Sequence, residues 1–291
     1  KRAGPGAPGL EHPEQQPEQD HRPCPRMQEQ PVQLRMQLVT RGFRNDRGFG
    51  DGMGRQPPFG EAGMGLMGKG PPYWFFRAVA DYQYGVADVI GVQTPGNLSF
   101  FGRWIRSGAR RVEILQNWLT QAPPQGCSIQ LAQTPLAGRT ILVYAGNMGV
   151  AQGMDLVLDL AERWTARTDI GFVLVGRGSD AARLRADAAR RGLTNMLFFD
   201  EIDPDEIAGL YQQCHVGIVA LDRRHKTHNI PGKFLSYMHC GLPALAVVNA
   251  GNDLVSMIAE ADVGACCDTH ELDDLAQQAE GLLARISEPG M

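Results

Sequence analysis

The chain has 291 residues, of which 43% are apolar, so it is long enough for two modest domains with ordinary cores. A formal net charge of −4 gives no electrostatic basis for binding nucleic acid or an anionic membrane, and no apolar run reaches the roughly 18 residues of a membrane-spanning helix. The six cysteines are scattered and form neither a CxxC pair nor a disulfide framework, which predicts a reduced, cytoplasmic protein.

The first 72 residues differ in composition from the rest. They are rich in Pro, Gln and Glu at first and then in Gly, without helical or strand periodicity. Because few apolar residues are available to offset the entropy of ordering the chain, we predict that residues 1–72 are low-complexity and disordered. A flexible linker or docking tail is the functional alternative for such a composition.

The next segment, residues 73–122, is aromatic at its start. Residues 73–93 predict a helix followed by a short strand, and residues 110–118 predict a second strand. A membrane-facing role is an alternative for Trp74, Phe75 and Phe76, but we expect them to pack on a core. The Pro- and Gly-containing connector at 121–126 marks a domain joint.

Beyond about residue 139, short apolar runs alternate with segments of helical length. This pattern repeats six times, and the strands are almost continuously apolar, which is typical of a parallel sheet covered by helices on both faces. We therefore predict an α/β fold with a Rossmann-like, doubly wound sheet. The expected strands lie within 140–146, 171–176, 195–202, 215–221, 242–248 and 263–267.

Two helix starts carry the signature of a capping box. Asp203 is followed by Pro204 and, at the third helical position, by Glu206. Asp268 and Glu271 repeat the spacing. Both pairs predict a side-chain cap at the start of the helix that follows.

In a doubly wound sheet, ligands bind at the carboxyl ends of the strands, in loops that lead into helices. The first such loop, residues 146–153, contains three glycines, which allow the backbone to approach a ligand closely. The helix after it offers N–H groups to an anion. A tight turn without any ligand explains the same residues equally well.

The second loop begins Gly176-Arg177-Gly178 and fits the pattern G-x-G-x-x-A, with Asp200 at a spacing that suggests a dinucleotide fingerprint. The match is weak, because this strand is the second of its domain. An NAD-dependent oxidoreductase is therefore a minor alternative.

The third loop, residues 222–233, carries four formal positive charges and two histidines ahead of a helix that begins near Pro231. Cationic side chains that converge on a helix start suit a diphosphate, although a solvated charged loop is the plain alternative. His225 and His228 have no further zinc ligands at a suitable spacing, so we expect no metal site. No G-x-S-x-G motif is present either.

Taken in order, these motifs resemble the carboxy-terminal half of a GT-B glycosyltransferase of the large retaining family 4, also called group 1. The resemblance covers about residues 73–288. The branch of the family that the chain resembles acts in bacterial surface-polysaccharide assembly, as aminodeoxyhexose transferases do. It implies a remnant of the acceptor domain at 73–122 and a nucleotide-sugar-binding domain at 123–291. The matching stretches are VEILQNWL, ILVYAGNMGVAQGMDLVLDLA, VGRGSDAARL and IPGKFLSYMHCGLPALA, with YQYGVADVIGVQTPGNLSFF before them.

The resemblance implies a retaining, metal-independent transferase that needs no cofactor and moves a sugar from a nucleotide-diphospho-sugar to a lipid-linked or glycan acceptor, as in lipopolysaccharide synthesis. Such an enzyme works in the cytoplasm, compatible with peripheral association at the inner face of the membrane, and the oligomeric state stays open. Catalysis would fall to Lys233 and His228, mainly by stabilising the departing diphosphate. The donor phosphates would contact Gly146, Asn147, Met148, Gly149, Arg177, Pro231, Gly232 and Lys233. The nucleoside would contact Gly176, Gly178, Glu201, Ile202 and Ser236.

The sequence departs from the family pattern at several charged positions. The two family glutamates align with His228 and Ser236, and the usual phosphate lysine falls at Gln152, with its partner arginine replaced near Asn147. Lys233 would then have to compensate for them. Further compensation would come from Arg177, Arg223 or Arg224.

Residues 1–72 show no βα units that could build a first domain. We therefore expect either a truncated or disturbed transferase or, as the alternative, a non-catalytic nucleotide-sugar-binding module.

Overall fold

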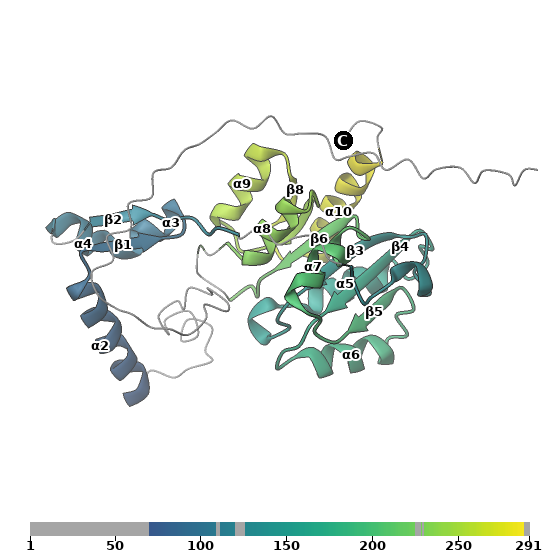
Figure 1. Cartoon of the computed structure of the whole chain (residues 1–291), viewed down its shortest axis with the longest axis horizontal. Coiled ribbons are helices and arrows are strands. Elements are labelled where there is room, and N and C mark those ends of the chain that lie inside the picture. The colour runs from purple at the N-terminus through teal and green to yellow at the C-terminus, as the bar shows by residue number, and fades with distance from the viewer. Residues whose placement is uncertain (1–69, 109–110, 120–125, 225–227, 229, 288–291) are drawn as a thin grey trace, which may run out of the picture. The chain divides into compact units, whose positions relative to one another are not determined.

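The computed structural model describes residues 70–108, 111–119, 126–224, 228 and 230–287 (Figure 1). The chain divides into two units, residues 1–51 and 52–291, and every described residue belongs to the second. The predicted disorder of residues 1–72 therefore falls almost wholly outside the described residues. The exception is its last part, because helix α2 (Pro71–Val86) already begins at Pro71.

The amino-terminal described segment forms a small parallel sheet. Strand β1 (Val89–Val92) pairs with β2 (Arg111–Ile114), as the sequence predicts, and the elements between them are α3 (Pro95–Leu98), η1 (Ser99–Phe101) and α4 (Gly102–Ser107). Ile90 and Val92 alternate with exposed neighbours and pack with Phe101 in a small apolar cluster. The prediction that Trp74, Phe75 and Phe76 pack on a core is wrong, because all three side chains are about half exposed or more.

The carboxy-terminal segment is built on a six-stranded parallel sheet, in the order β5-β4-β3-β6-β7-β8 (Figure 1). This order confirms the predicted doubly wound fold, because the chain moves outward from β3 in one direction and from β6 in the other. The strands are β3 (Thr140–Ala145), β4 (Ile170–Val175), β5 (Met196–Phe199), β6 (Val216–Ala220), β7 (Ala244–Val247) and β8 (Gly264–Cys267).

Helices cover both faces of this sheet, which explains why its inner strands are apolar throughout. The apolar side chains of α5, α6 and α10 pack on one face, and those of α7, α8 and α9 on the other. The helices are α5 (Asp155–Arg163), α6 (Ala181–Arg190), α7 (Ile207–Tyr211), α8 (Gly232–His239), α9 (Asp253–Ala261) and α10 (Leu272–Ile286). Short 3-10 turns occur at η2 (Leu131–Gln133), η3 (Val150–Gln152) and η4 (Pro204–Glu206).

Helix α8 is fixed to the point where the strand order reverses. Strands β3 and β6 pair only at Leu142 with Val216 and at Val143 with Gly217. The fully buried Tyr237 of α8 spans this short contact, since its hydroxyl lies 3.2 Å from the carbonyl oxygen of Val143 and 3.0 Å from that of Ile218. A Cβ on Gly217 would meet the Tyr237 ring at 2.4 Å, so the glycine makes room for the helix.

The two predicted capping boxes form differently from expectation. Asp203 does cap its helix, because its carboxylate accepts from the Asp205 amide. Glu206, however, accepts a hydrogen bond from the Ser128 amide instead of turning back to Asp203. The second prediction is wrong by three residues, since α10 has Glu271 itself as its N-cap residue.

Candidate functional site

A cation with no carboxylate partner among the described residues lies at the carboxyl end of β3. Lys233 comes from the first turn of α8, and its Nζ lies 4.5 Å from the centre of the Tyr144 ring on β3. The side chain also runs past Gly146, where a Cβ would be 3.7 Å from Lys233 Cε. The residue keeps partial exposure, but its ammonium is enclosed, and burial lowers the pKa of Lys233 to about 8.

The loops after β3 and β4 are joined through their backbones beside this cation. The Gly146 amide donates to the Val175 carbonyl, and the Met148 amide donates to the Arg177 carbonyl. In return, the Asp180 amide donates to the carbonyl of Met148, whose side chain is fully buried. The two glycine-rich loops predicted to bind the donor are therefore one connected structure.

The contact between these loops accounts for the glycines of the second one. A Cβ on Gly176 would lie 2.1 Å from the Gly146 carbonyl oxygen, and a Cβ on Gly178 would lie 2.2 Å from that of Met148. Real Cβ atoms do not approach so closely, so packing between the loops alone requires glycine at both positions. The G-x-G pattern thus gives no separate support for a dinucleotide.

Most amides of the first loop already have partners. Besides the amides of Gly146 and Met148, that of Gly149 donates to Gln152 Oε1 at 2.9 Å. Asn147 Nδ2 contacts the same oxygen at 3.2 Å, and the Asn147 carbonyl accepts from Tyr144 Oη at 2.6 Å. A phosphate bound here would depend on Lys233 and on the start of α8 more than on free amides of this loop.

Helix α8 begins beside Pro231, as predicted. Pro231 is the N-cap residue, and Gly232 is the first residue of the helix. The first amides of any helix lack partners within it, and together they attract an anion. Because Lys233 belongs to this same first turn, the helix start and the enclosed ammonium form one positive region.

The two positions that the resemblance aligns with glutamates have separate environments. Ser236 follows Lys233 by three residues on α8, so the two side chains share one face of the helix. His228 instead faces the start of α9, with Nδ1 at 3.8 Å from Asp253 Oδ1, and this nitrogen has no hydrogen-bond partner among the described residues. It also contacts Gly96, where a Cβ would meet Nδ1 at 2.5 Å.

Two other predicted site residues pair with each other. Arg177 Nε lies 2.9 Å from Glu201 Oε2, and both side chains are largely exposed at the ends of β4 and β5. An exposed pair of this kind opens readily. Ile202 packs against the apolar cluster beneath α7, α8 and α9.

The remaining candidate cations, Arg223 and Arg224, lie in the loop after β6. Arg224 is bound to Asp222 through Nε at 2.8 Å and Nη2 at 3.0 Å, and this pair holds the pKa of the Asp222 carboxyl below its usual range. Arg223 is exposed. Within the described residues, no group of three or more His, Cys, Asp or Glu side chains is placed to hold a metal ion, and no helix is long and apolar enough to cross a membrane.

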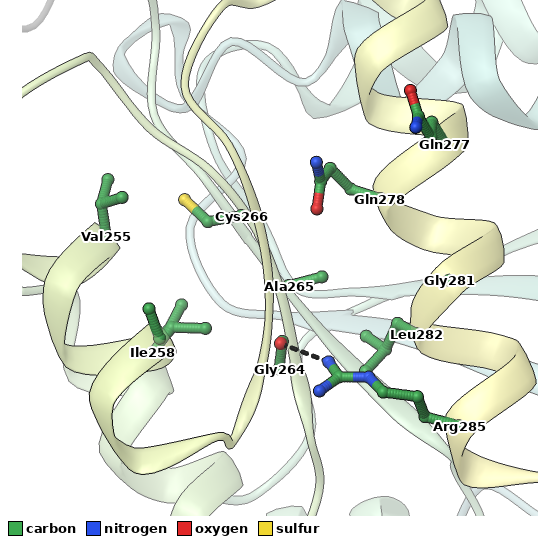
Figure 2. A pocket seen from close by; sticks show the side chains of 11 residues that line it. Val255, Ile258, Gly264, Ala265, Cys266, Gln277, Gln278, Gly281, Leu282 and Arg285 are labelled. Atoms are coloured by element: carbon green, nitrogen blue, oxygen red, sulfur yellow. Dashed lines mark hydrogen bonds between the residues drawn. The ribbon is translucent and has the colours of Figure 1, made fainter.

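A separate groove of about 570 Å³ lies beside the edge strand β8, between α9 and α10 (Figure 2). It contains none of the predicted site residues. Arg285 on its wall is bound to the Gly264 carbonyl at 2.6 Å (Figure 2). Its other walls include Val255, Ile258, Cys266, Gln278 and Leu282.

The sequence model of the family described as "Glycosyl transferases group 1" matches residues 139–285, slightly more than half of the chain. The chain belongs to this family. Among curated proteins, this glycosyltransferase-family chain is 28% identical over 216 residues to the colanic acid biosynthesis glycosyl transferase WcaI of Escherichia coli strain K12. The match covers 71% of this chain and 50% of WcaI, so the chain spans about half the length of that relative.

Solved structures show the same fold. WaaG, a glycosyltransferase involved in lipopolysaccharide biosynthesis, superposes with a TM-score of 0.56 at 15% identity, covering 74% of this chain and 59% of WaaG. The trehalose-6-phosphate protein of E. coli, solved with UDP-2-fluoro glucose bound, has a TM-score of 0.53 at 15% identity over 75% of this chain and 57% of its own. At such identities the likeness concerns the fold alone.

Sequence reasoning missed three residues that contact the candidate site. Tyr144 lies under the Lys233 ammonium. Gln93 accepts a hydrogen bond from Ile230, just before α8, and Asp253 accepts one from Gly96 in the turn after β1. The Thr94-Pro95 pair does signal a helix start in the sequence. No local pattern, however, indicates that this turn contacts residues more than 130 positions away.

Proposed function

We propose that this chain is the donor-binding part of a glycosyltransferase that moves a sugar from a nucleotide-diphospho-sugar to a lipid-linked or glycan acceptor in bacterial surface-polysaccharide synthesis. The family supports the reaction class, and the names of WcaI and WaaG support the polysaccharide setting. A UDP-sugar is the first donor to test, because a structure of the same fold was solved with one. The transfer is proposed to be retaining and to require neither metal nor cofactor.

The observation that carries this proposal is the enclosed ammonium of Lys233, which has no carboxylate partner among the described residues, at the switch point of the sheet. An enclosed cation without a counter-ion destabilises a fold, so its presence favours an anionic ligand. The start of α8 adds its amides and its dipole at the same place. A diphosphate would neutralise the cation, and its negative charge increases as the glycosidic bond breaks, which strengthens the interaction in the transition state.

The roles of the other residues follow from their positions. Phosphates are proposed to contact Lys233, Gly232 and the outer side of the loop at 146–149. Opening of the exposed ion pair between Arg177 and Glu201 would free Arg177 to contact the phosphates and Glu201 to contact the ribose. Ser236, one turn after Gly232, would face the nucleoside.

Thermal-shift measurements with UDP-, GDP- and dTDP-sugars test the proposal on the full chain. A ligand that binds only the folded state must raise the melting temperature, by an amount that grows with its concentration. We expect one nucleotide series to do so in the wild type and to lose most of its effect in Lys233→Met. Arg190→Met, which removes an exposed cation from α6, serves as the control. If no nucleotide stabilises the wild type, the donor site is wrong.

A non-catalytic nucleotide-sugar-binding module is the second candidate. It is favoured by the absence of carboxylates at positions 228 and 236 and by the contact of His228 with Gly96 and Asp253 instead of open space. Sugar-nucleotide binding without release of free nucleoside diphosphate in the presence of bacterial lipid-linked acceptors would support the module. Acceptor-dependent release would support the transferase.

A further inference from the structure

The turn after β1 is fastened to the segment that leads into α8. Gln93 is the first residue after this strand, and its side-chain amide contacts both backbone groups of Ile230. Gln93 Oε1 accepts from the Ile230 amide at 2.9 Å, and Gln93 Nε2 donates to the Ile230 carbonyl at 3.3 Å. Ile230 is itself buried, so these groups have little access to water. Gln93 therefore supplies hydrogen bonds that water would not easily replace.

Neighbouring residues of the same turn strengthen this attachment. The side chain of Thr94 is buried, and its Oγ1 lies 2.7 Å from Asn97 Oδ1 and 3.2 Å from the His228 carbonyl. The Gly96 amide donates to Asp253 Oδ2 at 2.7 Å, at the first residue of α9. The turn thus contacts both the segment before α8 and the first residue of α9.

We propose that Gln93 is a positioning residue of the donor site, which places Ile230 and thereby the start of α8 and Lys233. This inference rests on the donor site proposed above. Ile230 is followed directly by Pro231, whose ring fixes φ, so a displacement of Ile230 is passed to Gly232 and Lys233 with little loss. Gln93 would not touch the donor, and its effect on binding would be indirect.

The two hydrogen bonds to Ile230 require a side chain at position 93 that both donates and accepts. A side-chain amide offers one donor and one acceptor side by side, which matches the N–H and C=O of a single residue. A protonated carboxylic acid of the same shape offers the same pair. A carboxylate offers acceptors only, so it would still bind the Ile230 amide but would face the Ile230 carbonyl with a second oxygen.

The test uses the full chain, with UDP as the probe and isothermal titration as the measurement at pH 5 and pH 7. For Gln93→Ala we expect UDP affinity to fall roughly tenfold relative to wild type at both pH values, the effect of about one net hydrogen bond. Gln93→Glu should fall by a similar factor at pH 7. At pH 5, where a buried glutamate facing a carbonyl is largely protonated, it should recover to within about threefold of wild type.

The control is Gln277→Ala, which removes a side-chain amide of the same kind from an exposed position on α10. It should leave UDP affinity unchanged. The recovery of Gln93→Glu at low pH separates positioning from a general loss of structure, since a merely destabilised variant would not regain affinity on acidification. Hydrogen exchange at the Ile230 amide gives a second measurement, and it should be faster in Gln93→Ala.

The two proposals fail in different ways. If wild type binds none of UDP, GDP and dTDP, the donor site itself is wrong, and the role of Gln93 falls with it. If wild type binds UDP and both Gln93 variants bind it as tightly as wild type at pH 7, the donor site stands and the positioning role is overturned. The positioning role is also overturned if the UDP affinity of Gln93→Glu, relative to wild type, is reduced by the same factor at pH 5 and at pH 7.

Discussion

The Nζ atom of Lys233 lies 4.5 Å from the centre of the Tyr144 ring, and this contact joins α8 to β3 beside the switch point of the sheet. A cation over an aromatic face gains some of the stabilisation that water would have given it. It does not gain all of it, because burial still lowers the pKa of Lys233 to about 8. The position thus combines a cost to the fold with a positive charge that is available to a ligand.

Replacing Lys233 by methionine should separate these two effects. We expect Lys233→Met to weaken nucleotide binding by at least roughly tenfold while raising the free energy of unfolding by about 1 to 2 kcal/mol, since an apolar side chain of similar length replaces a desolvated cation. Urea denaturation and UDP titration measure the two quantities. A variant that is both less stable and equally able to bind UDP would contradict the assignment.

The pKa of Lys233 predicts a pH dependence of both stability and binding. Because the pKa is lowered in the folded state, the unfolded chain holds this proton more tightly, and stability should rise between about pH 8 and pH 10. A bound diphosphate would raise the same pKa, so binding should take up a proton, and UDP affinity should fall above about pH 8. Titration at pH 8.5 in buffers of different ionisation enthalpy would detect the uptake. If the binding enthalpy of the wild type does not depend on the buffer, or if Lys233→Met shows the same dependence, Lys233 is not the group that takes up the proton.

The glycines of the second loop should be intolerant of any side chain. Gly176→Ala places a methyl group 2.1 Å from the Gly146 carbonyl oxygen at a backbone φ of +136°, and we expect a loss of roughly 2 kcal/mol or more in unfolding free energy. Gly281→Ala on α10 meets nothing within 4 Å and should stabilise the protein by about 0.5 to 1 kcal/mol. Thermal and urea unfolding of the pair provide the test, and similar effects of both substitutions would refute the packing explanation.

The fold was predictable because each of its elements has a local signal. The strands of the larger sheet are nearly continuous apolar runs, and the helices between them carry apolar stripes, so period and length suffice to predict a doubly wound sheet. The position of the candidate site also follows from the sequence, since ligands of such sheets gather at the carboxyl ends of the strands.

The contacts within the site were less predictable, because they join residues far apart in the chain. Gln93 and Ile230 are separated by 137 positions, and neither has a sequence pattern that indicates the other. Gly176 and Gly178 fit a ligand-binding motif, yet the structure shows that the neighbouring loop occupies the space beside them. A glycine motif indicates that something approaches the backbone closely, but it does not distinguish a ligand from protein.

Tyr237 should contribute to stability through its hydroxyl as well as its ring. The hydroxyl is within hydrogen-bonding distance of the carbonyls of Val143 and Ile218, where β3 and β6 have little direct pairing. We expect Tyr237→Phe to lower the free energy of unfolding by about 1 to 3 kcal/mol, because buried carbonyls lose a donor. Urea unfolding with an unchanged m-value is the measurement, and Tyr82→Phe, at an exposed position on α2, is the control. Equal effects in the two variants would show that the hydroxyl of Tyr237 adds nothing.

Ser236 offers a direct test of the departure from the family pattern. The resemblance implies that a glutamate at this position grips the ribose hydroxyls, and a charge-assisted hydrogen bond is stronger than the neutral one that serine makes. Ser236 shares a helix face with Lys233, so a nucleotide whose phosphates contact Lys233 would have this position within reach. We expect Ser236→Glu to raise UDP affinity roughly tenfold.

Isothermal titration of Ser236→Glu with UDP and with inorganic pyrophosphate locates the gain. A true ribose contact should strengthen UDP binding and leave pyrophosphate binding unchanged or weaker, because the added carboxylate repels phosphate. Ser256→Glu, at an exposed position on α9, controls for the change in net charge. If Ser236→Glu leaves the preference for UDP over pyrophosphate unaltered, the nucleoside does not lie against this face of α8.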